Sequence, residues 1–266
     1  MSFAPNEAEP LRMNGNSRAY SIGALVRRSW HFLAALGLVT LVLSCQSIPD
    51  GKTGESAESL ANQMLAAASL EKWNNLQCVT FRFKGANRYV WDKKRGLVEY
   101  VHEDRRVLFS KNTFQAVAFD KGESITGEEL KEALGKANAS FINDSFWLQP
   151  AYHIRSPGTK LYYIDDHTLR VTFSSGGVTP GDTYVFHLDE KYRISTMEMW
   201  VSILPIPGVD ADFSDYVDHP PGIEIAAQRS ILVMGIPIDE VAFANAGGDC
   251  SDRFSPLIAA FPDLAQ

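Results

Sequence analysis

Two histidines lie close to aspartates in the sequence, and they are the first candidates for chemistry. His167 directly follows Asp165 and Asp166, and His187 comes two residues before Asp189. Imidazole and carboxylate groups on neighbouring strands can bind a metal ion or exchange protons. The chain has no His-Glu-x-x-His motif, no paired-cysteine spacing and no Gly-x-Ser-x-Gly motif. We therefore expect a polar turn at 165–167 and a protein that is not an enzyme, with no metal site and no cofactor.

A second group of acids has a spacing similar to that of a calcium-binding loop. It consists of Asp210, Asp212, Asp215 and Asp218. The glycine expected at the sixth position of such a loop is Asp215, and the glutamate expected at the twelfth is Pro221. The run therefore indicates a solvated acidic loop rather than a cation site.

Composition and charge exclude several classes of protein. Hydrophobic residues make up 45% of the 266 residues and charged residues 21%, which is an ordinary globular composition. The formal net charge of −7 argues against a basic surface that binds nucleic acid. We expect no nucleic-acid partner.

The N-terminal segment has the pattern of an export signal. Arg27 and Arg28 precede an apolar run over 31–43, which is followed by Ser44 and Cys45. The run is shorter than the roughly 20 residues that span a bilayer. Glu7 and Glu9 fit poorly in the basic part of a signal, so a start at Met13 instead of Met1 is an alternative.

The end of this segment, Val42-Leu43-Ser44-Cys45, resembles a bacterial lipobox. The resemblance implies that the Cys45 thiol receives a diacylglycerol and that cleavage makes Cys45 the new N-terminus. Val42 and Leu43 depart from the usual pattern, which leaves an uncleaved anchor or an ordinary signal as alternatives. Gln46 is not the aspartate of an inner-membrane retention signal. We therefore expect an exported protein, anchored by lipid in the outer membrane and facing the periplasm.

Two further cysteines remain once Cys45 is lipidated. Cys78 and Cys250 then lie in an oxidising compartment and can form one intramolecular disulfide, which we expect. The alternative is that Cys78 is a small buried apolar residue and Cys250 is a free thiol.

Hydrophobic periodicity predicts the elements that position these residues. A signal peptide over 1–44 and a tether over 45–55 precede a single domain over 56–243, and 244–266 is expected to be a loosely attached C-terminal tail. Helical spacing predicts a helix over 56–74 and two short helices over 127–137 and 139–149. Alternating residues predict strands that start near residue 79 and continue over 87–92, 97–102, 105–110, 113–119, 160–165, 168–174, 182–189, 193–203, 222–230 and 231–241.

This order predicts an α+β fold: a large curved antiparallel sheet, an open β-barrel, with an N-terminal helix and a short helical insert that acts as a lid or plug. The same order, after a lipobox, resembles the LolA/LolB-type superfamily of bacterial lipoprotein-handling proteins. Two segments, Phe-Ile-Asn-Asp-Ser-Phe-Trp-Leu (141–148) and Gly-Val-Thr-Pro-Gly-Asp-Thr-Tyr (177–184), also resemble an uncharacterised group of envelope proteins of that kind. The resemblance implies an open barrel whose concave face holds acyl chains.

The leading hypothesis is a noncatalytic envelope lipoprotein that binds an apolar ligand, an acyl chain or a lipid. The candidates for the lining are large side chains expected to point inward: Phe81, Phe83, Trp91, Phe141, Phe146, Trp147 and Trp200. The same residues could instead fill a solid core. In that alternative the chain is a structural lipoprotein that binds another envelope protein. An enclosed apolar void of hundreds of Å³ distinguishes the first from the second.

Overall fold

The structure is a computed structural model that describes residues 47–174, 181–204, 206–245, 250 and 252–265. The expected signal peptide and the lipidation residue Cys45 lie outside the described residues. The described residues from Ser47 onward belong to one compact unit.

Within the expected tether, Lys52 exchanges two backbone hydrogen bonds of 2.8 Å with Tyr163, so this part of the segment pairs with a strand.

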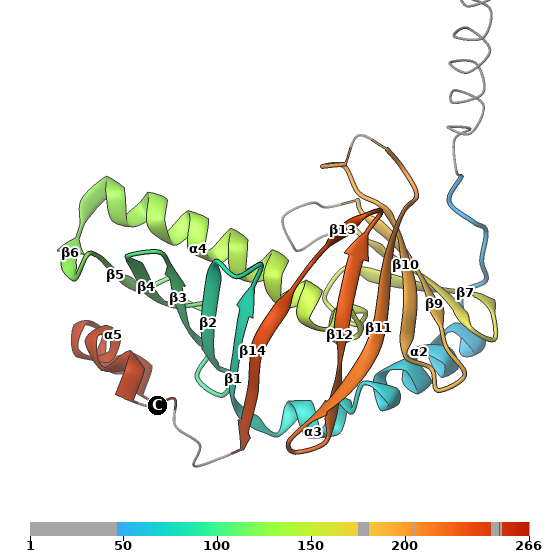
Figure 1. Ribbon diagram of the computed structural model, residues 1–266, viewed down its shortest axis with the longest axis horizontal. Helices are drawn as coiled ribbons and strands as arrows, with labels where there is room; N and C mark the ends of the chain where they lie inside the picture. Colours follow the sequence, from blue (N-terminus) through green and yellow to red (C-terminus); the bar gives the residue numbers. More distant parts are fainter. Residues whose placement is uncertain (1–46, 175–180, 205, 246–249, 251, 266) are drawn as a thin grey trace, which may run out of the picture. The chain divides into compact units, whose positions relative to one another are not determined.

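Two seven-stranded antiparallel sheets form the unit (Figure 1). The strands of the first sheet, in spatial order, are β14 (Ile238–Asn245), β1 (Leu76–Phe83), β2 (Asn87–Asp92), β3 (Leu97–His102), β4 (Arg105–Ser110), β5 (Ala116–Asp120) and β6 (Glu123–Ile125). Those of the second are β13 (Met234–Gly235), β12 (Ile223–Ile231), β11 (Val209–His219), β10 (Ile194–Trp200), β9 (Thr183–Leu188), β8 (Thr168–Phe173) and β7 (Thr159–Asp165). The predicted α+β class with an open antiparallel sheet is confirmed.

The division into two sheets corrects the expectation of one. The chain crosses from the second sheet to the first at Ile236 and Pro237. The Ile236 N–H still donates to Arg229 of β12, whereas the Pro237 carbonyl accepts from Lys84 next to β1. Proline has no N–H with which to continue the pairing to β12, and β14 then pairs with β1 instead.

The leading helix is broken where one continuous helix was predicted. It consists of α2 (Glu55–Ala67) and α3 (Leu70–Asn74), and Ser69 between them has a φ of 55°. A left-handed residue cannot continue a right-handed helix, so the chain changes direction there. The buried side of α2, which includes Leu60 and Met64, covers β7 and β8 of the second sheet.

The helical insert is one long helix, α4 (Gly127–Leu148), and not the two short helices that were predicted. No residue around Asn138 breaks the backbone hydrogen bonding. The helix ends at Gln149, which is extended because it precedes Pro150, and a 3₁₀ helix η1 (Pro150–His153) follows. The small buried residues Ala133 and Ala137 let α4 approach β4 and β5 closely.

The described part of the C-terminal segment packs firmly, in contrast to the loose attachment that was expected. It contains η2 (Asp252–Phe254), α5 (Ser255–Ala260) and η3 (Pro262–Ala265). Phe254, Leu257 and Leu264 are buried against Val90 and Leu108 of the first sheet. These strand residues alternate with those that face α4, so α5 covers the opposite face of that sheet (Figure 1).

The acidic run is part of a strand and not the loop that was predicted. In β11, Asp210 and Asp212 are exposed and alternate with the buried Val209, Ala211 and Phe213. The low strand propensity of aspartate obscured this alternation. The carboxylates therefore lie on the solvent side of the second sheet.

Candidate ligand cavity

A cavity of about 580 Å³ lies between α4, the β1–β2 hairpin and the inner side of the second sheet. Apolar and aromatic side chains dominate its wall. The wall consists of Phe83, Lys84, Trp91, Lys111, Phe141, Ile142, Asn143, Ser145, Phe146, Trp147, His153, Ser156, Pro157, Phe173, Asp182, Tyr184, Met199, Val201, Ile203, Leu204, Ile231 and Ile236. Both the volume and the apolar character are those of a small-molecule site.

Five of the seven residues proposed from the sequence line this cavity: Phe83, Trp91, Phe141, Phe146 and Trp147. Phe81 and Trp200 do not. Phe81 is fully buried and stacks on Tyr89 with ring centroids 4.7 Å apart, so it fills the core beside the cavity. Trp200 follows Met199 in β10 and points to the other face of the strand.

Aromatic contacts hold the cavity wall in place. The Trp91 and Phe141 rings meet edge to face at 5.2 Å. The Phe146 ring contacts Tyr184 at 5.1 Å and His153 at 5.4 Å. These contacts join α4 to both sheets, so the wall resists collapse into the void.

A polar network fixes the position of α4 above β2. Asp144 of α4 is buried, and its carboxylate accepts hydrogen bonds from the Tyr89 hydroxyl at 2.6 Å and the Asn87 amide at 2.8 Å. The Asn87 amide oxygen in turn lies 2.8 Å from His102 Nδ1. Burial and the Asp144 charge raise the pKa of Tyr89, which therefore stays protonated and continues to donate. These hydrogen bonds hold Asp144 in place and so orient Asn143 and Ser145, the adjacent residues of α4 that line the cavity.

The ionisable groups in the wall have different charge states. Burial lowers the pKa of His153 to about 4, so its imidazole is neutral at pH 7. Asp182 is buried, and its carboxylate accepts from the Ser202 N–H at 3.2 Å and the Tyr184 hydroxyl at 3.4 Å. Burial and Asp182 raise the pKa of Tyr184. Lys84 and Lys111 supply the positive charges of the wall.

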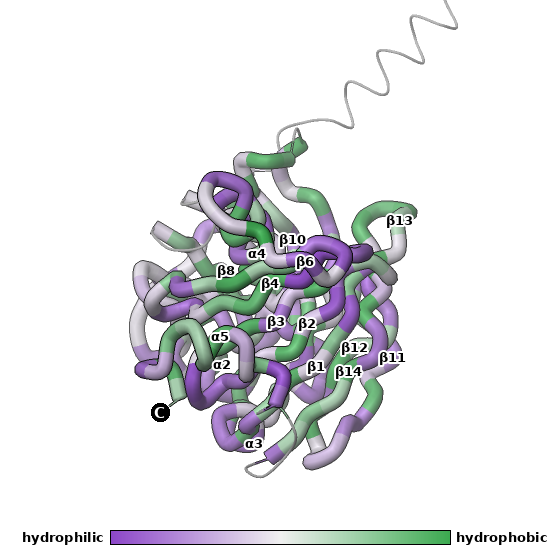
Figure 2. The backbone as a smooth tube through the Cα atoms, turned by 90° about the vertical axis from the view of Figure 1, so that its left-hand side faces the viewer, coloured by the Kyte–Doolittle hydropathy of each residue, from purple (hydrophilic) through white to green (hydrophobic). Residues whose placement is uncertain are grey.

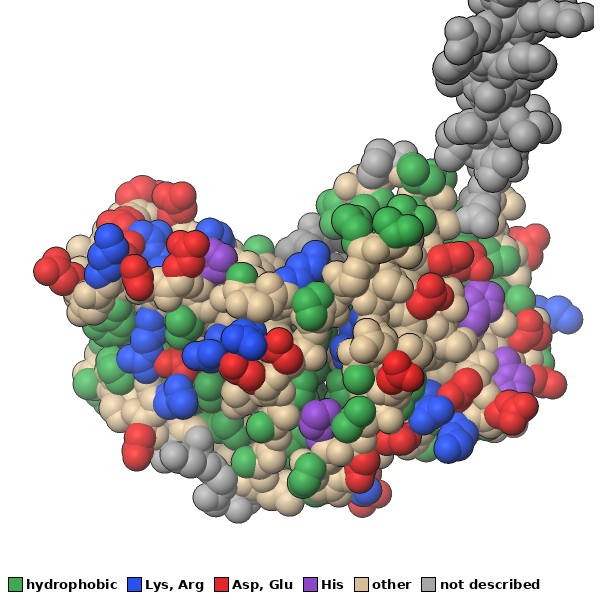
Figure 3. Space-filling model, in the orientation of Figure 1, with side chains coloured by type: hydrophobic (Ala, Val, Ile, Leu, Met, Phe, Trp, Pro, Cys, Tyr) green, Lys and Arg blue, Asp and Glu red, His purple; other side chains and the backbone are tan. Residues whose placement is uncertain are grey.

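Exposed apolar side chains lie at the end of the second sheet where Ile203 lines the cavity. Ala211 near the start of β11 pairs with Ile231 at the end of β12. The turn that follows β12 therefore lies at the same end of the sheet as the loop that precedes β11. We call these side chains the apolar rim; they are Ile203, Ile206, Leu232, Val233 and Met234, and each is at least 44% exposed. Figure 2 shows the hydrophobic turn next to β13, and Figure 3 shows hydrophobic side chains gathered at this end.

The part of the cavity wall contributed by the second sheet was not predicted from the sequence. Phe173, Tyr184 and Met199 lie in strands that were predicted, and their alternation with polar neighbours was the available signal. Which face of each strand meets α4 depends on strand pairing, however, and pairing is not visible in one strand.

The histidine–aspartate groups lie away from the cavity and have structural partners. The backbone N–H of His167 donates to the Asp165 carboxylate at 2.9 Å, as expected of a polar turn. The His187 Nε2 lies 2.6 Å from the Glu198 carboxylate on the neighbouring strand, while Asp189 binds Arg193 instead. Within the described ranges, no three His, Cys, Asp or Glu side chains are grouped so that they could bind a metal ion.

None of the helices in the described part of the chain has the length and apolar character needed to cross a membrane.

Cys78 of β1 and Cys250 form a disulfide, with their Cα atoms 6.0 Å apart. The bond joins the first sheet to the C-terminal segment.

No protein-family model and no curated protein sequence matches the chain. Among solved structures, it is similar to a DUF1329 family protein from Desulfovibrio piger, at 9% identity and a TM-score of 0.41, over 76% of this chain and 97% of that one. It is also similar to a "putative outer membrane lipoprotein-sorting protein domain" from Vibrio parahaemolyticus, at 10% identity and a TM-score of 0.32, over 77% of this chain and 100% of that one. Structural similarity at such low identity and TM-score gives no information about a ligand. The function is therefore argued from the cavity.

Proposed function

We propose that the protein is a noncatalytic lipoprotein of the bacterial envelope that binds an acyl chain or another apolar ligand in the cavity. The observation that carries the proposal is the void of about 580 Å³ with aromatic walls. Each methylene group transferred from water into such a site contributes about 0.8 kcal/mol. The rigid wall adds to this gain because little side-chain freedom is lost on binding.

The apolar rim supports the proposal because it offers a route into the cavity. Ile203 belongs both to the wall and to the exposed rim, with 68% of its surface exposed. An acyl chain that passes Ile203 stays in contact with apolar side chains from solvent to the interior. Exposed apolar patches of this kind on a soluble domain commonly mark ligand or interaction sites.

Uptake of a fluorescent fatty acid by the purified domain tests the proposal, together with native mass spectrometry after mild purification. Val201→Trp fills the cavity and is expected to abolish uptake, because the ring occupies the space of the acyl chain. Val217→Trp is the matched control: Val217 is 47% exposed and does not line the cavity, so uptake is expected to persist. A wild-type domain with no co-purified lipid and no uptake would contradict ligand binding and favour the structural alternative, a lipoprotein that binds another envelope protein.

The location is part of the same proposal. We infer export, lipidation at Cys45 and attachment to the outer membrane on the periplasmic side, from the lipobox-like segment and Gln46. Cys45→Ala is expected to leave an uncleaved precursor that no longer acquires lipid, as measured by the mass of the protein in the membrane fraction. Unchanged processing of the variant would identify an ordinary signal-peptidase site.

A further inference from the structure

Two lysine ammonium groups converge on one indole ring at the end of the cavity. The Lys111 Nζ lies 5.2 Å from the centroid of the Trp91 ring, and the Lys93 Nζ lies 5.7 Å from it. Trp91 and Lys111 both belong to the cavity wall. The side chains thus concentrate positive charge where the apolar wall ends.

This charge has no carboxylate partner in the described part of the chain. None of its ion pairs includes Lys111 or Lys93. The Lys93 ammonium donates to the backbone carbonyl of Trp73, and the Lys111 ammonium makes no hydrogen bond to any residue that the structure describes. The nearby Asp92 carboxylate is occupied by Arg95 and Gln77. The Trp91 ring, together with the Trp73 ring whose centroid lies 4.1 Å from the Lys93 Nζ, compensates these cations only in part.

The electrostatic consequences are visible in both ammonium groups. Partial burial, together with the charges of Lys94 and Lys111, lowers the pKa of Lys93 to about 7. Partial desolvation by the surrounding protein also lowers the pKa of Lys111, although its side chain remains accessible. The neighbouring His153 is neutral and adds no further positive charge. In a protein with a net charge of −7, the unpaired Lys111 ammonium, with the partly protonated Lys93 amine near it, favours an anion locally.

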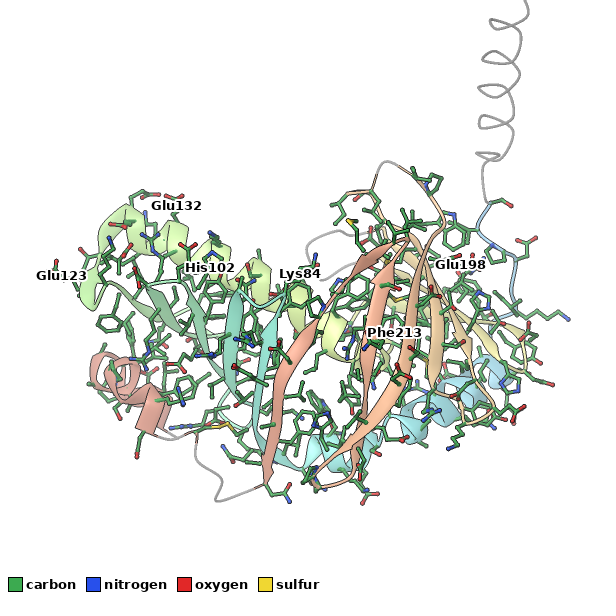
Figure 4. All side chains as sticks on the ribbon, viewed as in Figure 1. Lys84, His102, Glu123, Glu132, Glu198 and Phe213 are labelled. Carbon is green, nitrogen blue, oxygen red and sulfur yellow. A yellow bond between two sulfur atoms is a disulfide. The ribbon has the colours of Figure 1, made fainter. Side chains whose placement is uncertain are left out.

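The strand register separates this end of the cavity from the other lysine in the wall. Lys84 follows β1 at the turn of the β1–β2 hairpin, where Phe83 pairs with Asn87 (Figure 4). Lys111 follows β4 at the opposite end of the sheet, where Ser110 pairs with Leu97 and Leu97 pairs with Asp92. A strand of this length extends over about 3.3 Å per residue, so the two lysines mark different ends of the cavity.

We propose that the ligand is an anionic amphiphile, whose acyl chain lies along the aromatic wall of α4 and whose carboxylate or phosphate head group binds Lys111 at the Trp91 end, with Lys93 behind it. The inference rests on the proposed function, because it specifies the ligand of the same cavity. A carboxylate head group would come from a fatty acid and a phosphate from a phospholipid.

Displacement of a neutral polarity-sensitive dye tests the inference, with dodecanoate, dodecyl phosphate and the uncharged methyl dodecanoate as competitors below their micelle concentrations. Wild-type protein is expected to bind the better of the two anions about tenfold more tightly than the ester, the size of one charge-assisted hydrogen bond. Lys111→Gln is expected to remove most of this preference and leave ester binding intact. Lys131→Gln, which removes the same charge from an exposed position of α4 outside the cavity wall, is expected to keep this preference.

The outcomes separate the two proposals. Tighter binding of dodecyl phosphate supports a phospholipid as the source, and tighter binding of dodecanoate supports a free fatty acid. Equal affinity for ester and anions in wild-type protein, or a preference that survives in Lys111→Gln, overturns the inference and leaves the proposed function standing. A wild-type protein that takes up neither the dye nor any of the amphiphiles overturns both.

Discussion

Two regions of the interior differ in how they are filled. On the first sheet, the Phe81 ring stacks on Tyr89 and the Tyr89 ring contacts Tyr100, with centroids 4.7 and 5.4 Å apart, and all three are buried. On the second sheet, Phe173 and Tyr184 belong to the wall of a void. One helix, α4, faces both regions, so the difference arises from the residues that it presents along its length.

The helix changes character from one end to the other. Its first half presents Ala133 and Ala137, and it approaches β4 and β5 closely. Its second half presents Phe146 and Trp147, which reach across to Tyr184 and Phe213 with ring centroids 5.1 and 6.1 Å apart. Small residues on a helix allow a close, filled interface, whereas the large rings of Phe146 and Trp147 bridge a wider space whose remainder is the cavity. The comparison predicts opposite responses to mutation in the two regions.

The largest expected effect is the loss of a ring from the filled region. Phe81→Ala removes a side chain with no exposed surface and is expected to lower the free energy of unfolding by about 3–5 kcal/mol. Phe173→Ala removes the same atoms beside the existing void, where fewer packing contacts are lost, so a smaller decrease is expected. Urea denaturation of both variants measures the difference, and equal losses would show that the void closes in solution.

The disulfide gives the first sheet a covalent tie that the described part of the second sheet lacks. Replacing both Cys78 and Cys250 with serine is expected to lower the free energy of unfolding by about 2–5 kcal/mol, since the bond closes a separation of 172 residues. Reduction of wild-type protein should give a similar loss. Thiol counting on the unfolded, unreduced protein provides the control, because two free thiols would show that the bond does not form.

The polar network under α4 sharpens the comparison, because it holds the helix at the border between the two regions. Asp144→Asn removes the charge that receives the Tyr89 and Asn87 hydrogen bonds, and we expect a loss of about 1–3 kcal/mol. Asp218→Asn is the matched control on the exposed side of β11, where we expect little change. An equal response of the two variants would show that the network does not anchor α4.

A further effect concerns pH and His153 of η1, which lines the cavity. His153 has a pKa of about 4 in the folded protein and an ordinary value of 6.5 when unfolded. Between these values the unfolded chain binds more protons, so the free energy of unfolding falls as the pH falls through this window. His153→Leu is expected to reduce that fall. Urea midpoints at pH 7 and pH 4.5 measure it, and an unchanged pH dependence would place the His153 imidazole in solvent.

Local patterns in the sequence were sufficient for most individual elements. The alternation of Val79, Phe81 and Phe83 predicted a half-buried strand, and these residues lie in β1. The pattern failed where a residue type opposed its structure. The aspartates of β11 were interpreted as a loop, although the Val209–Ala211–Phe213 alternation gives that strand its buried face. In the same way, the C-terminal segment is held by Phe254 and Leu257, whose partners lie far away in the sequence.

The sequence by itself determined the composition class, the antiparallel α+β character and five of the residues that line the cavity. Each of these depends on the period of side chains along a short segment, which is a local property. Only the tertiary structure decided that the strands divide into two sheets at Pro237, that the cavity remains open and that Lys111 and Lys93 both approach the Trp91 ring. These features depend on the pairing of distant segments and on how closely α4 approaches each sheet. Such distances are set by the packing of the whole core, and no periodicity within one segment encodes them.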